Sequence, residues 1–191
     1  MNVGIYIYDE AEVLDFSGPF EVFTTASRVC PDNDPFNVFL VGETPKAVRA
    51  RGGYQVIPHY GISNHPVIDL LIVAGGVPDK ELQKPHVLEW IKNQSNLARY
   101  TASVCTGVFL LGAAEVVTTH NVTTHWEDIP ALQQRFPELR VRRDVRWVED
   151  GNIFTSAGIS AGIDMSLHLV KILHNRTLSE KTARQMEYDP G

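Results

Sequence analysis

The sequence has little cysteine, no clustered histidine and no motif typical of a bound cofactor. Its two cysteines, Cys30 and Cys105, are too few for a disulfide framework, so a reducing cytoplasm is the expected location. Neither cysteine stands in a metal-ligand spacing, and the 7 histidines are scattered along the chain. We therefore expect neither a structural zinc ion nor another cofactor.

Excess positive charge and long apolar runs are also lacking. The 17 Lys and Arg residues are outnumbered by 23 Asp and Glu residues, and no basic run offers a surface for nucleic acid. No apolar stretch approaches the roughly 20 residues that span a bilayer, and the N-terminus lacks the features of a signal peptide. At 43% hydrophobic content, 191 residues predict a single domain over residues 1–191. A small molecule, rather than nucleic acid or a membrane, is the expected partner.

Strand-like and helix-like segments alternate along the chain. Apolar and β-branched runs predict strands at 3–8, 36–42, 69–74, 100–104 and 121–125, short strands within 46–57, and a hairpin of 141–148 with 152–155. Helices are expected from an N-cap at Ser17, with Pro19 in the first turn, to Cys30, and at 85–96, 108–114, 127–136, about 159–173 and 178–188. This alternation predicts one α/β domain with a mostly parallel sheet.

The segment 102–107 (ASVCTG) has the pattern of a strand, a tight turn and a helix. Cys105 would then lie at the carboxyl end of a sheet strand and near the positive end of a helix dipole. Both features favour a thiolate, the nucleophilic form of cysteine. A cysteine without such surroundings is more often a small buried residue, which is the role we expect for Cys30.

Two further segments are expected at the same edge of the sheet. Ligands of open α/β sheets bind beyond the carboxyl ends of the strands, where Asp15 and Gly75-Gly76 follow their strands. Glycines can bring backbone N–H groups close to a ligand, and an acid can move protons. Taken singly, the glycines are equally consistent with a tight turn, and Asp15 with a solvated loop acid. Their convergence on Cys105 favours an active site.

These segments resemble the ThiJ/PfpI superfamily, within the class I glutamine amidotransferase-like fold. The resemblance begins with Gly75-Gly76 and 103–107 (SVCTG). Four further segments resemble the isonitrile hydratases of the superfamily: 14–19 (LDFSGP), 123–126 (TTHW), 158–164 (GISAGID) and 187–190 (EYDP). It implies a flavodoxin-like three-layer sandwich and a homodimer.

The resemblance also implies roles for individual residues. Cys105 would be the nucleophile, Asp15 the helper acid, and the Thr106 hydroxyl with the Gly76 N–H would orient water or steady developing charge. The reaction would be the addition of water to an isonitrile. Phe16, Val77 and Trp126 are candidates for the pocket walls, and His125 is a possible pocket residue only.

Other branches of the superfamily fit less well. The intracellular-protease branch has a histidine directly after its cysteine, where this chain has Thr106. The amidotransferases need a histidine and a glutamate two residues apart, and neither His168 nor His174 has that glutamate. Two alternatives stay open. One is a ligand-sensing domain of an AraC-type regulator, in which a helix-turn-helix module would follow. The other is a redox or stress role, in which Glu21 rather than Asp15 would stand beside Cys105.

Overall fold

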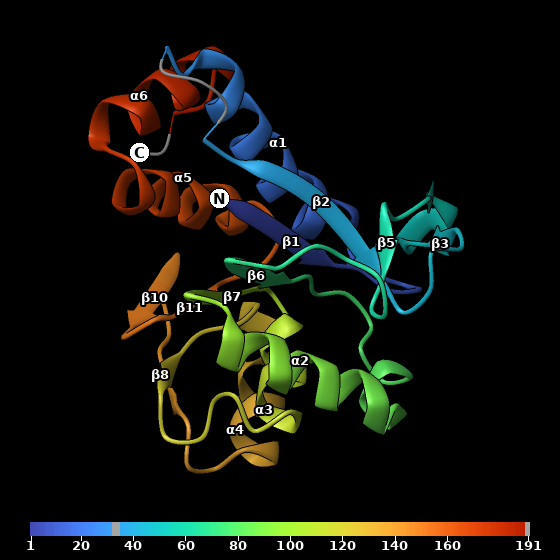
Figure 1. Ribbon diagram of the computed structural model, residues 1–191. Helices are drawn as coiled ribbons and strands as arrows, with labels where there is room; N and C mark the ends of the chain where they lie inside the picture. Colours follow the sequence, from blue (N-terminus) through green and yellow to red (C-terminus); the bar gives the residue numbers. More distant parts are fainter. Residues whose placement is uncertain (32–34, 190–191) are drawn as a thin grey trace.

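A sheet forms the middle layer of the computed structural model, which describes residues 1–31 and 35–189 (Figure 1). Its seven strands follow the order β10-β11-β7-β6-β1-β2-β5. Every neighbouring pair is parallel except β10 and β11. The strands are β1 (Asn2–Tyr6), β2 (Asn37–Gly42), β5 (Tyr60–Gly61), β6 (Leu70–Val73), β7 (Tyr100–Val104), β10 (Trp147–Asp150) and β11 (Ile153–Ser156). The expected mostly parallel sheet is confirmed.

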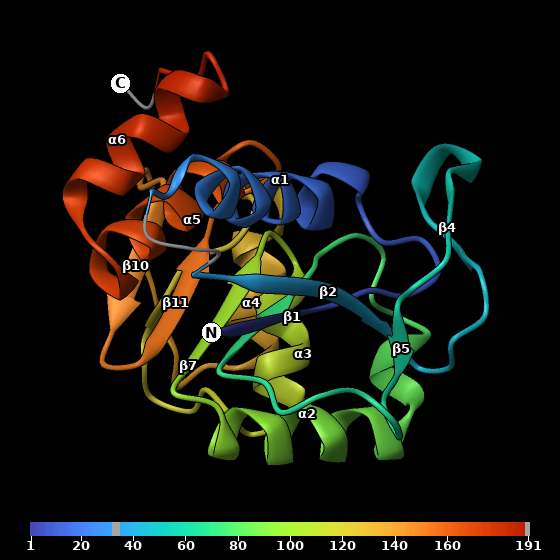
Figure 2. The same cartoon turned by 45° about the horizontal axis from the view of Figure 1, so that its top comes forward.

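Helices cover both faces of this sheet. Figures 1 and 2 show α1, α5 and α6 together on one face and α2 with α3 on the other. Their bounds are α1 (Val13–Val29), α2 (Pro85–Leu97), α3 (Gly107–Ala113), α5 (Ala161–Leu173) and α6 (Arg176–Gln185). The three-layer sandwich predicted from the resemblance is therefore the observed fold. None of the helices in 1–31 and 35–189 has the length and apolar character to cross a membrane.

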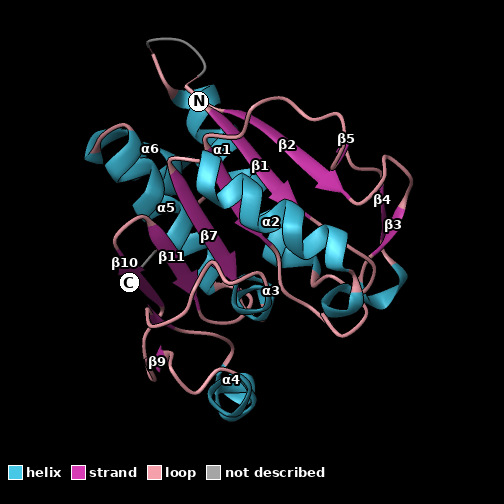
Figure 3. Ribbon diagram, turned by 60° about the horizontal axis from the view of Figure 1, so that its bottom comes forward, coloured by secondary structure: helices cyan, strands magenta, loops and turns pink. Residues whose placement is uncertain are grey.

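The central strands are buried along nearly their whole length because both of their faces are covered by helices. In β1, β6 and β7 nearly every side chain is buried. The register places Tyr6 opposite Val73, and Val73 opposite Ser103. These three strands consequently end at one edge, and Figure 3 shows the arrowheads of β1 and β7 pointing the same way, with α3 beginning near the tip of β7. The segments that follow them meet there.

The start of α1 differs from the prediction. The helix begins at Val13 with Glu12 as its N-cap, rather than after Ser17. The Ser17 hydroxyl donates to the Val13 carbonyl at 2.7 Å, and Pro19 lies inside the helix. Burial of the helix face that carries Asp15 and Pro19 outweighs the local preference for a helix start at Ser17 and Pro19. Asp15 therefore extends from a first helical turn and not from a loop.

Several short elements lie outside the main layers. β3 (Val48–Arg49) and β4 (Gln55–Val56) are the short strands predicted within 46–57, and they pair antiparallel on either side of the turn η1 (Arg51–Gly53). The strand expected at 121–125 is reduced to β8 (Asn121–Val122), which pairs with β9 (Arg140–Val141). The helix expected at 127–136 is divided into η3 (Trp126–Asp128) and α4 (Ile129–Arg135). Residue Ile159 precedes α5 instead of lying in it. Of the loop expected at 31–35, residues 32–34 lie outside the described part of the chain.

Candidate active site

Cys105 occupies a sharp turn between β7 and α3. Its φ is 54°, a left-handed conformation that is unusual for a residue with a side chain and has to be held by its surroundings. The Cys105 N–H donates to the Ser156 carbonyl at 3.1 Å, and Thr124 Oγ1 donates to the Cys105 carbonyl at 2.9 Å. A Cβ atom at Gly107 would lie 2.3 Å from the Val73 carbonyl oxygen, so glycine permits the close start of α3. The structure contains the predicted turn.

Asp15 reaches this turn from α1 and is fully buried. A Cβ atom at Gly75 would lie 2.6 Å from Asp15 Oδ2, which places the carboxyl directly against the Gly75 backbone. Burial raises the pKa of Asp15 to about 8, and the charge of Glu12 adds to the rise. Interactions with the Cys105 thiol and the Gly75 N–H oppose it. Neither carboxyl oxygen has a close hydrogen-bond partner among the described residues. Asp15 is therefore mostly protonated at neutral pH.

The Cys105 thiol is neutral as well. Burial, together with the smaller effect of the negative charge of Asp15, raises its pKa to about 12. The backbone N–H groups of Thr106 and Ile159 donate toward the sulfur and lower the pKa only in part. The expectation of a resting thiolate is wrong, because removal of the sulfur from water outweighs the dipole of the seven-residue helix α3.

Thr106 joins the turn to the loop after β6. Its Oγ1 donates to the Gly76 carbonyl and accepts from the Gly76 N–H, both at 2.8 Å. Gly76 has φ 135°, and a Cβ atom there would lie 2.3 Å from the Glu10 carbonyl oxygen. The two groups expected to serve a substrate therefore bond to each other. The donors that face the sulfur are the N–H groups of Thr106 and Ile159.

A cavity of about 1050 Å³ opens in front of Cys105. Of the residues expected at the site, Gly76, Val77, Thr106 and His125 line it. Phe16 does not, because it is buried in the core. Trp126 does not either. It is 72% exposed and lines an adjacent cavity of about 530 Å³.

His125 is held in the wall between these two cavities. Its Nδ1 accepts a long hydrogen bond from the Glu127 N–H at 3.4 Å and lies 3.6 Å from Asp128 Oδ2. A Cβ atom at Gly158 would lie 2.0 Å from the imidazole ring, so the ring packs directly on the Gly158 backbone. The charge of Asp128 contributes to the raised pKa of Cys105. Sequence reasoning missed Asp128, which follows no strand of the central sheet.

Tyr8 is a second residue that the sequence did not reveal. It is 3% exposed, and its hydroxyl has no close hydrogen-bond partner within the described part of the chain. Burial raises the pKa of this hydroxyl well above 10, and the charges of Asp15, Glu81 and Cys105 add to the rise. It is therefore a neutral phenol. Its only signal in the sequence is a phenol just beyond an apolar strand.

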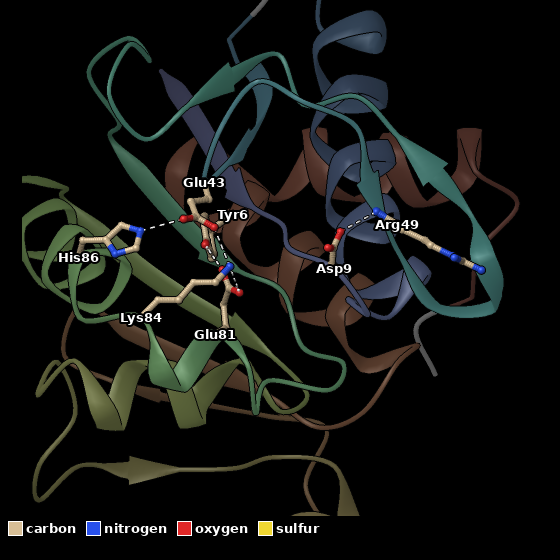
Figure 4. Close-up of polar contacts among 7 residues, drawn as sticks. All are labelled: Tyr6, Asp9, Glu43, Arg49, Glu81, Lys84 and His86. Carbon is tan, nitrogen blue, oxygen red and sulfur yellow. Dashed lines mark hydrogen bonds and ion pairs between the residues drawn. The ribbon is translucent and has the colours of Figure 1, made fainter.

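A polar network fixes the segment that follows Gly76 (Figure 4). Lys84 Nζ lies 2.8 Å from the buried Glu81 and 2.6 Å from Glu43. Tyr6 donates its hydroxyl proton to Glu81 at 2.5 Å, and His86 Nε2 lies 2.9 Å from Glu43. Nearby, Asp9 Oδ1 accepts from the Arg49 N–H at 2.9 Å. These contacts tie one wall of the cavity to the ends of β1 and β2.

Glu21 lies away from the reactive turn. It is exposed on α1 and accepts from Thr25 Oγ1 at 2.9 Å. The acid beside Cys105 is thus Asp15. The contact between Glu21 and Cys105 that the redox or stress alternative requires is not formed. No group of three or more His, Cys, Asp or Glu side chains in residues 1–31 and 35–189 could hold a metal ion.

Comparison with known proteins places the chain among relatives of this fold. The profile of the DJ-1/PfpI family matches residues 1–172. The isonitrile hydratase of Pseudomonas putida is 33% identical over all of this chain and 80% of its own length. The HTH-type transcriptional regulator GbdR of Pseudomonas aeruginosa is 29% identical over 98% of this chain, which spans only 51% of that regulator. A ThiJ/PfpI family protein from Pseudomonas syringae superposes with a TM-score of 0.88 at 26% identity, covering 100% of this chain and 76% of its own. The chain therefore belongs to the DJ-1/PfpI family.

Proposed function

We propose that this protein is an isonitrile hydratase-like lyase, which adds water to an isonitrile and releases an N-substituted formamide. The observation that carries the proposal is the buried, neutral Asp15 carboxyl set against the neutral Cys105 thiol at the base of the cavity. An isonitrile carbon needs both a proton and a nucleophile, and this pair can supply both. The similarity to the hydratase of Pseudomonas putida supports the same reaction.

The first step forms a thioimidate. Asp15 donates the proton of one carboxyl oxygen to the terminal isonitrile carbon, and the Cys105 sulfur forms a bond to that carbon. The thiol proton passes to the other oxygen of Asp15, so the carboxyl is neutral before and after the step. The N–H groups of Thr106 and Ile159 stabilise negative charge on the sulfur while the proton leaves. No resting thiolate is required.

The second step consumes water. Water adds to the thioimidate carbon and gives its proton to Asp15, while the other oxygen of Asp15 protonates the substrate nitrogen. The tetrahedral intermediate then collapses to the formamide: its hydroxyl proton returns through Asp15 to the sulfur as the carbon–sulfur bond breaks. Acid–base assistance of this kind contributes about 10²–10⁴-fold in rate.

The test is the product formed from a small alkyl isonitrile. Wild-type protein should yield the corresponding formamide by mass spectrometry, and Cys105→Ala and Asp15→Asn should reduce the yield to background. Cys30→Ala is the matched control, since Cys30 lies at the end of α1 beside His174. No formamide from folded wild-type protein, or an equal yield from Cys105→Ala, would refute the reaction.

A ligand-sensing domain is the second candidate. It is supported by the alignment with the regulator GbdR, which covers nearly all of this chain but half of that regulator. As a sensor, the cavity would bind a small molecule and leave it unchanged. A ligand that raises the melting temperature without being converted, together with no turnover of any isonitrile tried, would favour sensing over hydration.

We also propose that the protein acts as a homodimer in the cytoplasm. Trp126, Val145 and Ile159 are large apolar side chains that are 72%, 39% and 39% exposed, and all three line the cavity next to His125. A second copy of the chain could cover them. Light scattering after size-exclusion chromatography should then give a mass twice the chain mass of 21.3 kDa. The variant Trp126→Lys should instead give the mass of a single chain.

A further inference from the structure

Ile159 stands at a strained position beside the nucleophile. It lies in the loop 157–160 between β11 and α5, and its φ of 51° is costly for a β-branched residue. Its N–H donates toward the Cys105 sulfur, and its side chain lines the cavity. A strained conformation persists only when the surrounding structure holds it.

Arg146 holds this loop at both of its ends. On one side, the Arg146 carbonyl accepts from the Ala157 N–H at 2.9 Å. On the other, guanidinium nitrogens Nη1 and Nη2 donate to Ser160 Oγ at 3.3 and 3.2 Å. Ile159 lies between the two attachment points, so a displacement of Arg146 would displace its N–H.

Asp164 fixes the guanidinium in turn. Arg146 Nε donates to Asp164 Oδ2 at 2.6 Å, and Nη2 contacts the same carboxylate. The side chain of Asp164 is only 8% exposed, and its other oxygen accepts from the Tyr188 hydroxyl at 2.8 Å. A buried carboxylate of this kind depends on its partners, which makes the arrangement rigid. The Arg146–Asp164 pair is also geometrically specific, because the planar guanidinium group can donate to a carboxylate and to a hydroxyl at the same time.

We propose that Arg146 is a positioning residue: through Asp164 and Ser160 it holds the Ile159 N–H on the Cys105 sulfur. Tyr188 extends this clamp to the segment after α6. The effect on turnover rests on the proposed hydratase function, whereas the effect on the loop does not. Loosening the clamp should leave substrate binding nearly intact and should slow the step in which charge develops on sulfur.

The discriminating variant is Arg146→Lys. A lysine keeps a cation for the buried Asp164 but cannot also span to Ser160, so the protein should fold with a loosened loop. Arg146→Ala is less suitable, because it leaves Asp164 without its cation. Arg142→Lys is the matched control, since Arg142 is an exposed arginine that bonds Asn121 from the same segment.

Two measurements decide the proposal. Hydrogen exchange followed by mass spectrometry should show amide protection in peptides spanning 157–160 falling about tenfold in Arg146→Lys and unchanged in Arg142→Lys. Formamide production should show kcat falling about tenfold, the effect of losing one hydrogen bond to a developing charge, with KM within twofold. Ser160→Ala should act in the same direction on both readouts.

The outcomes separate the two ideas. Unchanged protection of 157–160 in Arg146→Lys would overturn the clamp, and lost protection with an unchanged kcat would overturn the role of the Ile159 N–H. If wild-type protein makes no formamide, the proposed function fails, and the exchange measurement still decides whether Arg146 holds the loop.

Discussion

Replacing Asp15 by asparagine tests the central electrostatic feature of the site. Asparagine has nearly the same shape as aspartic acid but cannot exchange a proton. In the folded protein the pKa of Asp15 lies at about 8, against an ordinary value of 3.8, because the carboxyl is buried. The folded state therefore binds a proton that the unfolded chain releases between these two pH values. Wild-type stability should fall as pH rises from about 4 to about 8, and the Asp15→Asn variant should lack this component.

The expected size of the effect follows from the linkage between proton binding and folding. A pKa difference of one unit corresponds to about 1.4 kcal/mol, so Asp15 should contribute a loss of about 4 kcal/mol between pH 5 and pH 8. This is a large part of the stability of a typical domain, about 5–15 kcal/mol. Titration of Cys105, whose pKa lies at about 12, does not interfere in that range.

Urea unfolding of both proteins at several values between pH 5 and pH 8 measures the effect. The free energies of unfolding should diverge with rising pH in favour of Asp15→Asn, whatever constant offset the new amide introduces. Glu21→Gln, an exposed acid on the same helix, should run parallel to wild type. Parallel curves for wild type and Asp15→Asn would show that Asp15 is already ionised in the fold, and the proton relay through a neutral carboxyl would be refuted.

Three further predictions concern the same site. Formamide production should decline above about pH 8 as Asp15 loses its proton, and a kcat that still rises at pH 9 would contradict this. Gly75→Ala places a Cβ atom 2.6 Å from Asp15 Oδ2, so unfolding midpoints should show a loss of about 1–3 kcal/mol, with activity abolished. Tyr8→Phe removes a buried hydroxyl that has no close hydrogen-bond partner among the described residues, so the free energy of unfolding should not fall, and a loss of more than about 1 kcal/mol would show that the hydroxyl is bonded in the fold.

The sequence by itself determined the layered α/β architecture and the place of the turn that carries Cys105. Continuous apolar strands such as 69–74 can only be buried on both faces, which requires helices on each side of a parallel sheet. The short runs that end in Cys105 and in Gly75-Gly76 then fix where those residues lie, because parallel strands finish at one edge. Asp15 was identifiable for the same reason.

Only the tertiary structure decided the chemistry at that edge. The protonation of Cys105 and Asp15 depends on burial by residues distant in sequence, and this reverses the thiolate expected from the local helix. The pairing of Thr106 with Gly76 and the clamp of Arg146 likewise join segments far apart in the chain. A local pattern carries no information about desolvation or about partners brought together by folding. Sequence therefore located Cys105, the proposed nucleophile, and packing set the protonation of its thiol, the N–H groups that donate to its sulfur and the residues around it.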